Sequence, residues 1–88
     1  MPNDSITVML VDDHPVVRDG YSKLLRSQPD ITVVAEMDDG ESAYNQYNEI
    51  NPDVVVLDLN MPGIGGLETI RRLRAKDSKA TIRTSHGR

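Results

Sequence analysis

The stretch VVVLDLNMPGIGG, residues 54–66, decides the fold of this chain. Its opening residues are apolar without alternation, which favours a strand that is buried on both faces, as in a parallel sheet. Asp58 follows that apolar run, directly before a loop over residues 60–66 that is rich in proline and glycine. Because a lone buried charge is costly, we expect the Asp58 carboxylate to lie at the edge of the sheet and to meet solvent and a cation there.

The remaining segments alternate between strand and helix patterns. Apolar, β-branched runs predict strands over residues 6–11 and 31–37. Apolar residues at helical spacing predict helices over residues 15–27 and 43–50, and a third helix over residues 67–76 follows the quoted loop. The order βαβαβα predicts an α/β domain with a parallel sheet and right-handed crossovers.

Two of the predicted helices have apolar faces that we expect to pack inward, and the first is expected to begin at Asp13 or His14 as its cap. The inward residues would be Val17, Tyr21, Leu24 and Leu25 in the first helix, and Leu67, Ile70 and Leu73 in the third.

Length, charge and composition exclude several classes of protein. The chain has 88 residues, no cysteine and a net charge of −4, so it is one small domain without a disulfide framework or a thiol site. No membrane span or signal peptide is visible, and we expect a cytoplasmic protein. Seven of the ten basic residues follow residue 68. They indicate a solvated helix face rather than a DNA-binding surface, because no Trp or Phe accompanies them.

Carboxylates end two of the predicted strands. Asp12 and Asp13 follow the first strand, and Asp58 ends the third. Functional groups collect at the carboxyl ends of parallel strands, so the three side chains are expected to meet. Like charges that are so close repel unless a cation lies between them, and Mg²⁺ suits a small set of oxygen ligands. The alternative is that Asp12 and Asp13 only cap the first helix and Asp58 only ends a strand.

The two histidines, His14 and His86, are isolated in the sequence. Capping or simple exposure is the role we expect for each, rather than metal binding or catalysis.

Three segments together resemble a known family. VMLVDDHPVVRDGYSKLL, VVAEMDDGESA and PDVVVLDLNMPGIGGLETIRRLR are similar to the receiver domain of two-component response regulators, in particular the NarL/FixJ type. The resemblance runs over residues 5–82 and implies the flavodoxin-like (CheY-like) doubly wound parallel sheet. On this basis residues 1–88 are a truncated receiver domain, with residues 83–88 as a tail outside the family pattern and no output domain.

The resemblance also implies roles for individual residues. Asp58 would accept a phosphoryl group from the histidine of a sensor kinase. Asp13, with Asp12 partly through water, would hold Mg²⁺ together with Asp58 and the backbone carbonyl of Asn60. Further along the chain, Pro62 and Gly63 would shape the loop and Gly66 would open the third helix. The helix over residues 15–27 would form much of the kinase-docking face, with Val17 and Tyr21 as core residues.

The sequence departs from the family pattern in several places. A receiver domain has five βα units, and this chain ends as the fourth strand starts. The family hydroxyl after that strand and the lysine after the fifth, which bind phosphate oxygens, are expected to be missing, with Ser85 and Lys79 unsuited to replace them. Gly65 stands where the family usually has Asp, which predicts a looser loop and a less well-capped third helix, at a cost of about 0.5–1 kcal/mol.

A sheet of order 2-1-3, with at most the start of a fourth strand, would leave the third strand at its edge. We expect such an apolar edge to pair with another chain, through Val54–Leu57 or through the segment Thr81–Ile82, which predicts a homo-oligomer.

Two functions follow from these observations. The first is phosphorelay signalling, in which a receiver domain that is not an enzyme, beyond weak autophosphatase activity, controls transcription through an output domain that alone contacts DNA. The second is a non-switching fragment that only self-associates or docks to the kinase.

Overall fold

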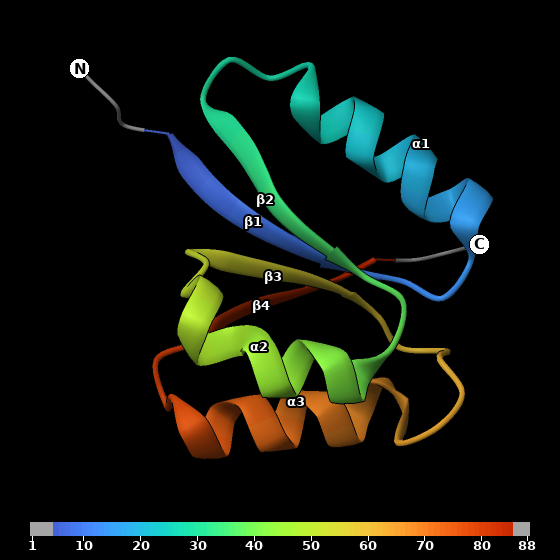
Figure 1. The fold of residues 1–88 in the computed structure, drawn as a ribbon, viewed down its shortest axis with the longest axis vertical. Helices are drawn as coiled ribbons and strands as arrows, with labels where there is room; N and C mark the ends of the chain where they lie inside the picture. Colours follow the sequence, from blue (N-terminus) through green and yellow to red (C-terminus); the bar gives the residue numbers. More distant parts are fainter. Residues whose placement is uncertain (1–4, 86–88) are drawn as a thin grey trace.

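The computed structural model describes residues 5–85, and Figure 1 shows a parallel sheet with helices on both faces. In chain order the elements are β1 (Ile6–Val11), α1 (Pro15–Arg26), β2 (Ile31–Met37), α2 (Gly40–Ile50), β3 (Val54–Asp58), α3 (Gly65–Lys76) and β4 (Thr81–Ser85). The predicted α/β class and the order of elements are therefore confirmed. Within the described residues no helix is long and apolar enough to cross a membrane. His86 and the last residues of the predicted tail lie outside the described range.

The sheet has the order β2-β1-β3-β4, and every neighbouring pair is parallel. The strand β1 lies between β2 and β3, so its residues Val8 to Val11 are almost completely buried. All four strands point the same way, which brings their carboxyl ends, and the loops that leave them, to one edge of the sheet.

The prediction that β3 forms an exposed edge is wrong. Val54 pairs with Thr81 and Val55 with Ile82, so the two segments expected to join separate chains join each other within one chain. The sequence of β4 is mostly polar and gives a weak strand signal, but Ile82 packs against the core. Among the described strands, β2 and β4 are the outer ones.

The main core lies between the sheet and the pair α2 and α3. It is made of Met9, Val11, Ala43, Tyr47, Val55, Leu57, Met61, Leu73 and Ala80. The two helices approach closely where Gly40 faces the Thr69 side chain. A hydrogen bond of 2.9 Å from the Tyr47 hydroxyl to Asp77 satisfies the one polar atom of that buried aromatic residue.

The helix α1 covers the opposite face of the sheet, over β2 and β1 (Figure 1). Its buried Ser22 donates a hydrogen bond of 3.0 Å to Glu36 of β2, and Arg26 pairs with the same carboxylate. Val17 and Tyr21, expected in the core, are only half-buried.

Two of the expected inward leucines point outward. Leu24 is 60% exposed and Leu67 is 73% exposed. In α3 Leu73 is buried as predicted, together with Gly66 and Thr69, and the start of the helix packs on the backbone at the end of β3 through a glycine rather than through a large side chain.

Candidate functional site

Four side chains converge at the carboxyl edge of the sheet. Asp12, Asp13 and His14 follow β1, and Asp58 is the last residue of the neighbouring strand β3. Each offers one ligand atom, and these atoms all lie within 4.8 Å of one another. The expected meeting of the three carboxylates is observed, and we call the four residues the acidic cluster.

The carboxylates differ in exposure and in partners. Asp12 is 1% exposed and Asp58 is 3% exposed, whereas Asp13 is half-buried. The Oδ1 atom of Asp12 accepts a hydrogen bond of 2.8 Å from the backbone N–H of His14, and Asp58 Oδ1 accepts one of 3.0 Å from the N–H of Asn60. Both aspartates therefore have one oxygen held by the loop that follows their own strand.

The second oxygen of Asp12 has no such partner. Asp12 Oδ2 is buried and accepts no hydrogen bond from any described residue. A buried carboxylate oxygen without a donor is costly, and two further carboxylates face it. This donor set of carboxylate oxygens fits a hard divalent cation such as Mg²⁺.

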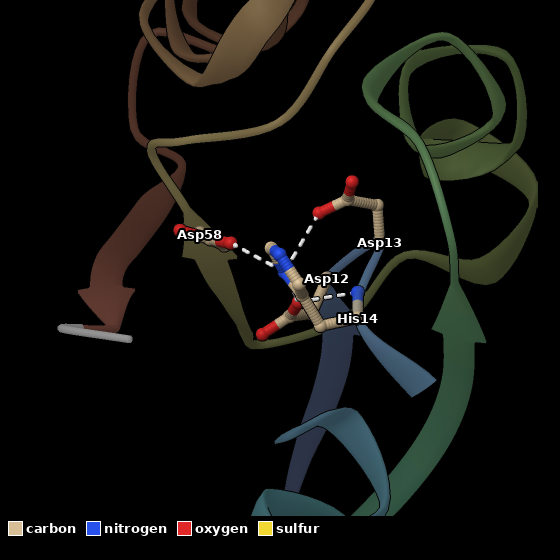
Figure 2. A group of neighbouring side chains, drawn as sticks. All are labelled: Asp12, Asp13, His14 and Asp58. Atoms are coloured by element: carbon tan, nitrogen blue, oxygen red, sulfur yellow. Dashed lines mark hydrogen bonds and ion pairs between the residues drawn. The ribbon is translucent and has the colours of Figure 1, made fainter. Parts of the chain in front are cut away.

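His14 contributes a nitrogen atom to the same cluster, as Figure 2 shows. Its Nδ1 atom lies 3.0 Å from Asp13 Oδ1, 3.2 Å from Asp12 Oδ1 and 3.5 Å from Asp58 Oδ2. The hydrogen bond to Asp12 and the negative charge of Asp13 raise the pKa of His14 above 6.5. As expected, His14 is the N-cap residue of α1 and its side chain is exposed; it makes no side-chain capping bond, and its ring nitrogen faces the carboxylates of the cluster.

The loop between β3 and α3 depends on its glycines. Gly63 has a φ of 77° and Gly65 a φ of 80°, the left-handed region that side chains rarely adopt. Gly66 lies against the β3 backbone, where an added Cβ would come within 2.4 Å of the Leu59 Cα. Pro62 is exposed in the same turn, and Asn60 follows Asp58 directly.

The structure refines two expectations for this loop. The helix α3 begins at Gly65, one residue before Gly66, and no side chain caps it. Gly65 also suits the backbone of the turn, because the positive φ at this position would strain an aspartate.

Sequence reasoning missed the position of a hydroxyl residue. Ser85, the last residue of β4, pairs in register with Asp58. Residues in register on parallel strands project to the same face of the sheet, so Ser85 stands beside Asp58 at the carboxyl edge. Lys79 lies before β4, at the opposite edge. A strand over residues 81–85 would bring Ser85 to the carboxyl edge of the sheet, but this polar segment gives only a weak strand signal.

Comparison with known proteins places this architecture and cluster in a family. The family model for the response regulator receiver domain matches residues 8–87. The chain belongs to the response regulator receiver domain family. Receiver domains of the NarL type are among its relatives: the nitrate/nitrite response regulator protein NarL of Escherichia coli K12 is 46% identical over 76 residues. That match covers 86% of this chain and 35% of the relative.

Solved structures of receiver domains agree with the fold. A two-component response regulator of the LuxR family from Aurantimonas superposes with a TM-score of 0.87 at 48% identity, over 91% of this chain and 57% of the other. The receiver domain of a response regulator, NarL, from Mycobacterium tuberculosis gives a TM-score of 0.80 at 32% identity, over 93% and 64%. The chain thus spans about a third of the curated relatives it matches, and more than half of these solved chains.

The tight contact at Gly66 predicts a large effect of one methyl group. Gly66→Ala should lower the free energy of unfolding in urea by about 1–3 kcal/mol, because backbone must move to admit the Cβ. Gly20→Ala is the matched control: it lies inside α1 with no atom near the added Cβ, and should raise stability by about 0.5–1 kcal/mol. Equal effects of the two substitutions would contradict the close packing of α3 on β3.

The position of His14 predicts a pH dependence in metal-free buffer. Because its pKa is raised in the folded chain, its stabilising effect should be complete below pH 6.5 and fade as the pH rises through the folded pKa. The difference in unfolding free energy between the wild type and His14→Asn should therefore shrink over that interval. NMR titration of the His14 ring should give a midpoint above 6.5, and a midpoint at or below 6.5 would refute the contacts described.

Proposed function

We propose that the chain receives a phosphoryl group on Asp58 from the histidine of a sensor kinase, as a cytoplasmic relay step that controls transcription in the parent protein. The observation that carries this proposal is the convergence of three carboxylates at the carboxyl edge of the sheet, with the buried Asp12 Oδ2 left without a donor. Relatives named as response regulators support it.

The residues divide the chemistry among them. Asp58 is the nucleophile: one of its oxygens forms a bond to phosphorus as the bond to the kinase histidine breaks, and the leaving imidazole keeps the electron pair and takes up a proton. Its Oδ1 is oriented by the Asn60 N–H, which leaves Oδ2 directed to the acidic cluster. Orientation of this kind supplies much of what phosphoryl transfer needs.

Asp12, Asp13, Asp58 and the backbone carbonyl of Asn60 are the groups we assign to Mg²⁺. When bound there, Mg²⁺ would offset the negative charge of the carboxylates and of the phosphoryl oxygens. Pro62, Gly63 and Gly66 hold the loop that sets the position of Asn60 relative to Asp58, as the positive φ of Gly63 and the tight packing of Gly66 indicate.

Ser85 is the residue we assign as the hydroxyl donor to the phosphoryl oxygens. Its register with Asp58 supports this role, which replaces the earlier expectation that no such hydroxyl is present. No described lysine stands at this edge of the sheet.

The alternative of a non-switching, self-associating fragment is not favoured by the relatives. The self-association in this alternative was expected at an open β3 edge, and in the structure that edge pairs with β4. Self-association would use the outer edge of the polar strand β4. Contact with DNA we assign to an output domain, and contact with the kinase to α1.

Phosphorylation of Asp58 is tested with a small phosphodonor. The chain incubated with acetyl phosphate and Mg²⁺ should gain the mass of one phosphoryl group by intact mass spectrometry, and hydroxylamine should remove it as expected for an acyl phosphate. Asp58→Asn should show no adduct, whereas Asp53→Asn, an exposed carboxylate at the other end of β3, should behave as the wild type. No adduct at saturating donor would refute the proposal.

Ser85 and Thr84 form a matched pair for the hydroxyl. They are neighbours on β4 and project to opposite faces of the sheet. Ser85→Ala should slow adduct formation by roughly tenfold, the value of one hydrogen bond to a charged group, while Thr84→Ala should leave the rate unchanged. Equal rates for the two variants would remove Ser85 from the site.

A further inference from the structure

The nitrogen of His14 sets this acidic cluster apart from a site made only of oxygen. Three carboxylates face a single imidazole nitrogen, and the ligand atoms of all four residues lie within 4.8 Å of one another. The oxygen Asp12 Oδ2 is buried and lacks a donor, which is an independent indication that a cation completes the cluster.

The separations of the His14 nitrogen from the carboxylate oxygens suit neighbouring places in one coordination sphere. Bonds of about 2.1 Å in an octahedral arrangement place adjacent ligand atoms about 3.0 Å apart and opposite ones about 4.2 Å apart. The Nδ1 atom of His14 lies 3.0, 3.2 and 3.5 Å from oxygens of Asp13, Asp12 and Asp58. Nδ1 lies within hydrogen-bond distance of Asp12 Oδ1, so it must release its proton to bind a metal; one ion in the place of that proton could then contact the nitrogen and oxygens of all three residues.

The chemistry of the donors then decides which ion fits best. Carboxylates suit Mg²⁺ and Mn²⁺ alike, but imidazole nitrogen is a poor ligand for Mg²⁺ and a good one for first-row transition metals. We propose that His14 is a direct ligand that makes the cluster bind Mn²⁺ more tightly than Mg²⁺. This inference rests on the cation site of the proposed function and adds a nitrogen ligand and a preference among ions.

The backbone around His14 supports such a role. Its N–H is held by Asp12 Oδ1 at 2.8 Å, and this contact fixes the residue at the start of α1 with its ring over the cluster. Its side chain is 55% exposed, so the ring can adjust around an ion without disturbing the core. A substitution at this position should therefore change the ligand set and not the fold.

The test uses the chain without any affinity tag and follows binding of the metal alone. Free Mn²⁺ is measured by electron paramagnetic resonance during titration, and Mg²⁺ affinity is obtained by competition. The variant His14→Asn offers oxygen in place of nitrogen and keeps a residue favoured at a helix N-cap. The matched control is His86→Asn, which removes the other histidine of the sequence.

The wild type should bind Mn²⁺ at least about tenfold more tightly than Mg²⁺, a preference that one nitrogen ligand can provide. His14→Asn should lose about tenfold in Mn²⁺ affinity and change its Mg²⁺ affinity by less than about twofold, while His86→Asn should change neither. Spin-echo modulation from a directly bound nitrogen should appear in the Mn²⁺-loaded wild type and be absent in His14→Asn.

The outcomes separate the two claims. If neither ion binds the wild type, the cation site of the proposed function fails. If Mg²⁺ binds but His14→Asn lowers both affinities equally, leaves both unchanged or keeps the nitrogen modulation, the cation site stands and the role of His14 as a selective ligand is overturned.

Discussion

The site depends on the repulsion among carboxylates held together at the end of a buried sheet. Asp12 and Asp58 are almost completely buried, Asp12 directly after β1 and Asp58 at the end of the adjacent strand β3. Like charges in such a place destabilise the fold unless another group offsets them. The hydrogen bonds from the N–H groups of His14 and Asn60 do so for one oxygen of each residue. The remaining carboxylate oxygens can be offset by the His14 imidazole and by a bound cation.

The rest of the fold serves to hold these carboxylates in place. The strands β1 and β3 run side by side through the centre of the sheet, so neither can shift without disrupting the core formed with α2 and α3. The helix α3 approaches the end of β3 through Gly66, which fixes the loop that follows Asp58. Under the proposed function, rigidity at this edge would orient the Asp58 carboxylate for transfer.

Periodicity and spacing were enough to predict the fold class, the first three strands and the meeting of the three aspartates. Parallel strands must bring their carboxyl ends together, so this part follows from the order of elements alone. The strand β4 was predicted only as a possible start, because its sequence is polar apart from Ile82, which packs on the core. Without a complete fourth strand, β3 was predicted to lie at the edge of the sheet, and the register of Ser85 with Asp58 was not predicted.

The direction of the His14 ring could not be predicted from sequence because the direction of a side chain at a helix start depends on the loop. Leu73 is buried as predicted, but Leu24 and Leu67 are exposed, because a helical period gives a face of the helix and not how far that face reaches the sheet. The cluster itself remains the decisive feature, and its electrostatic cost can be measured directly.

The most direct test is the stability of Asp12→Asn with and without a divalent cation. This substitution keeps the shape of the side chain and the oxygen that accepts from the His14 N–H, but removes the charge. In buffer containing a chelator the variant should be more stable than the wild type, by about 1–3 kcal/mol in urea unfolding. Added Mg²⁺ should stabilise the wild type strongly and the variant little. A variant that is less stable than the wild type in chelator, and that gains as much from Mg²⁺, would contradict the account.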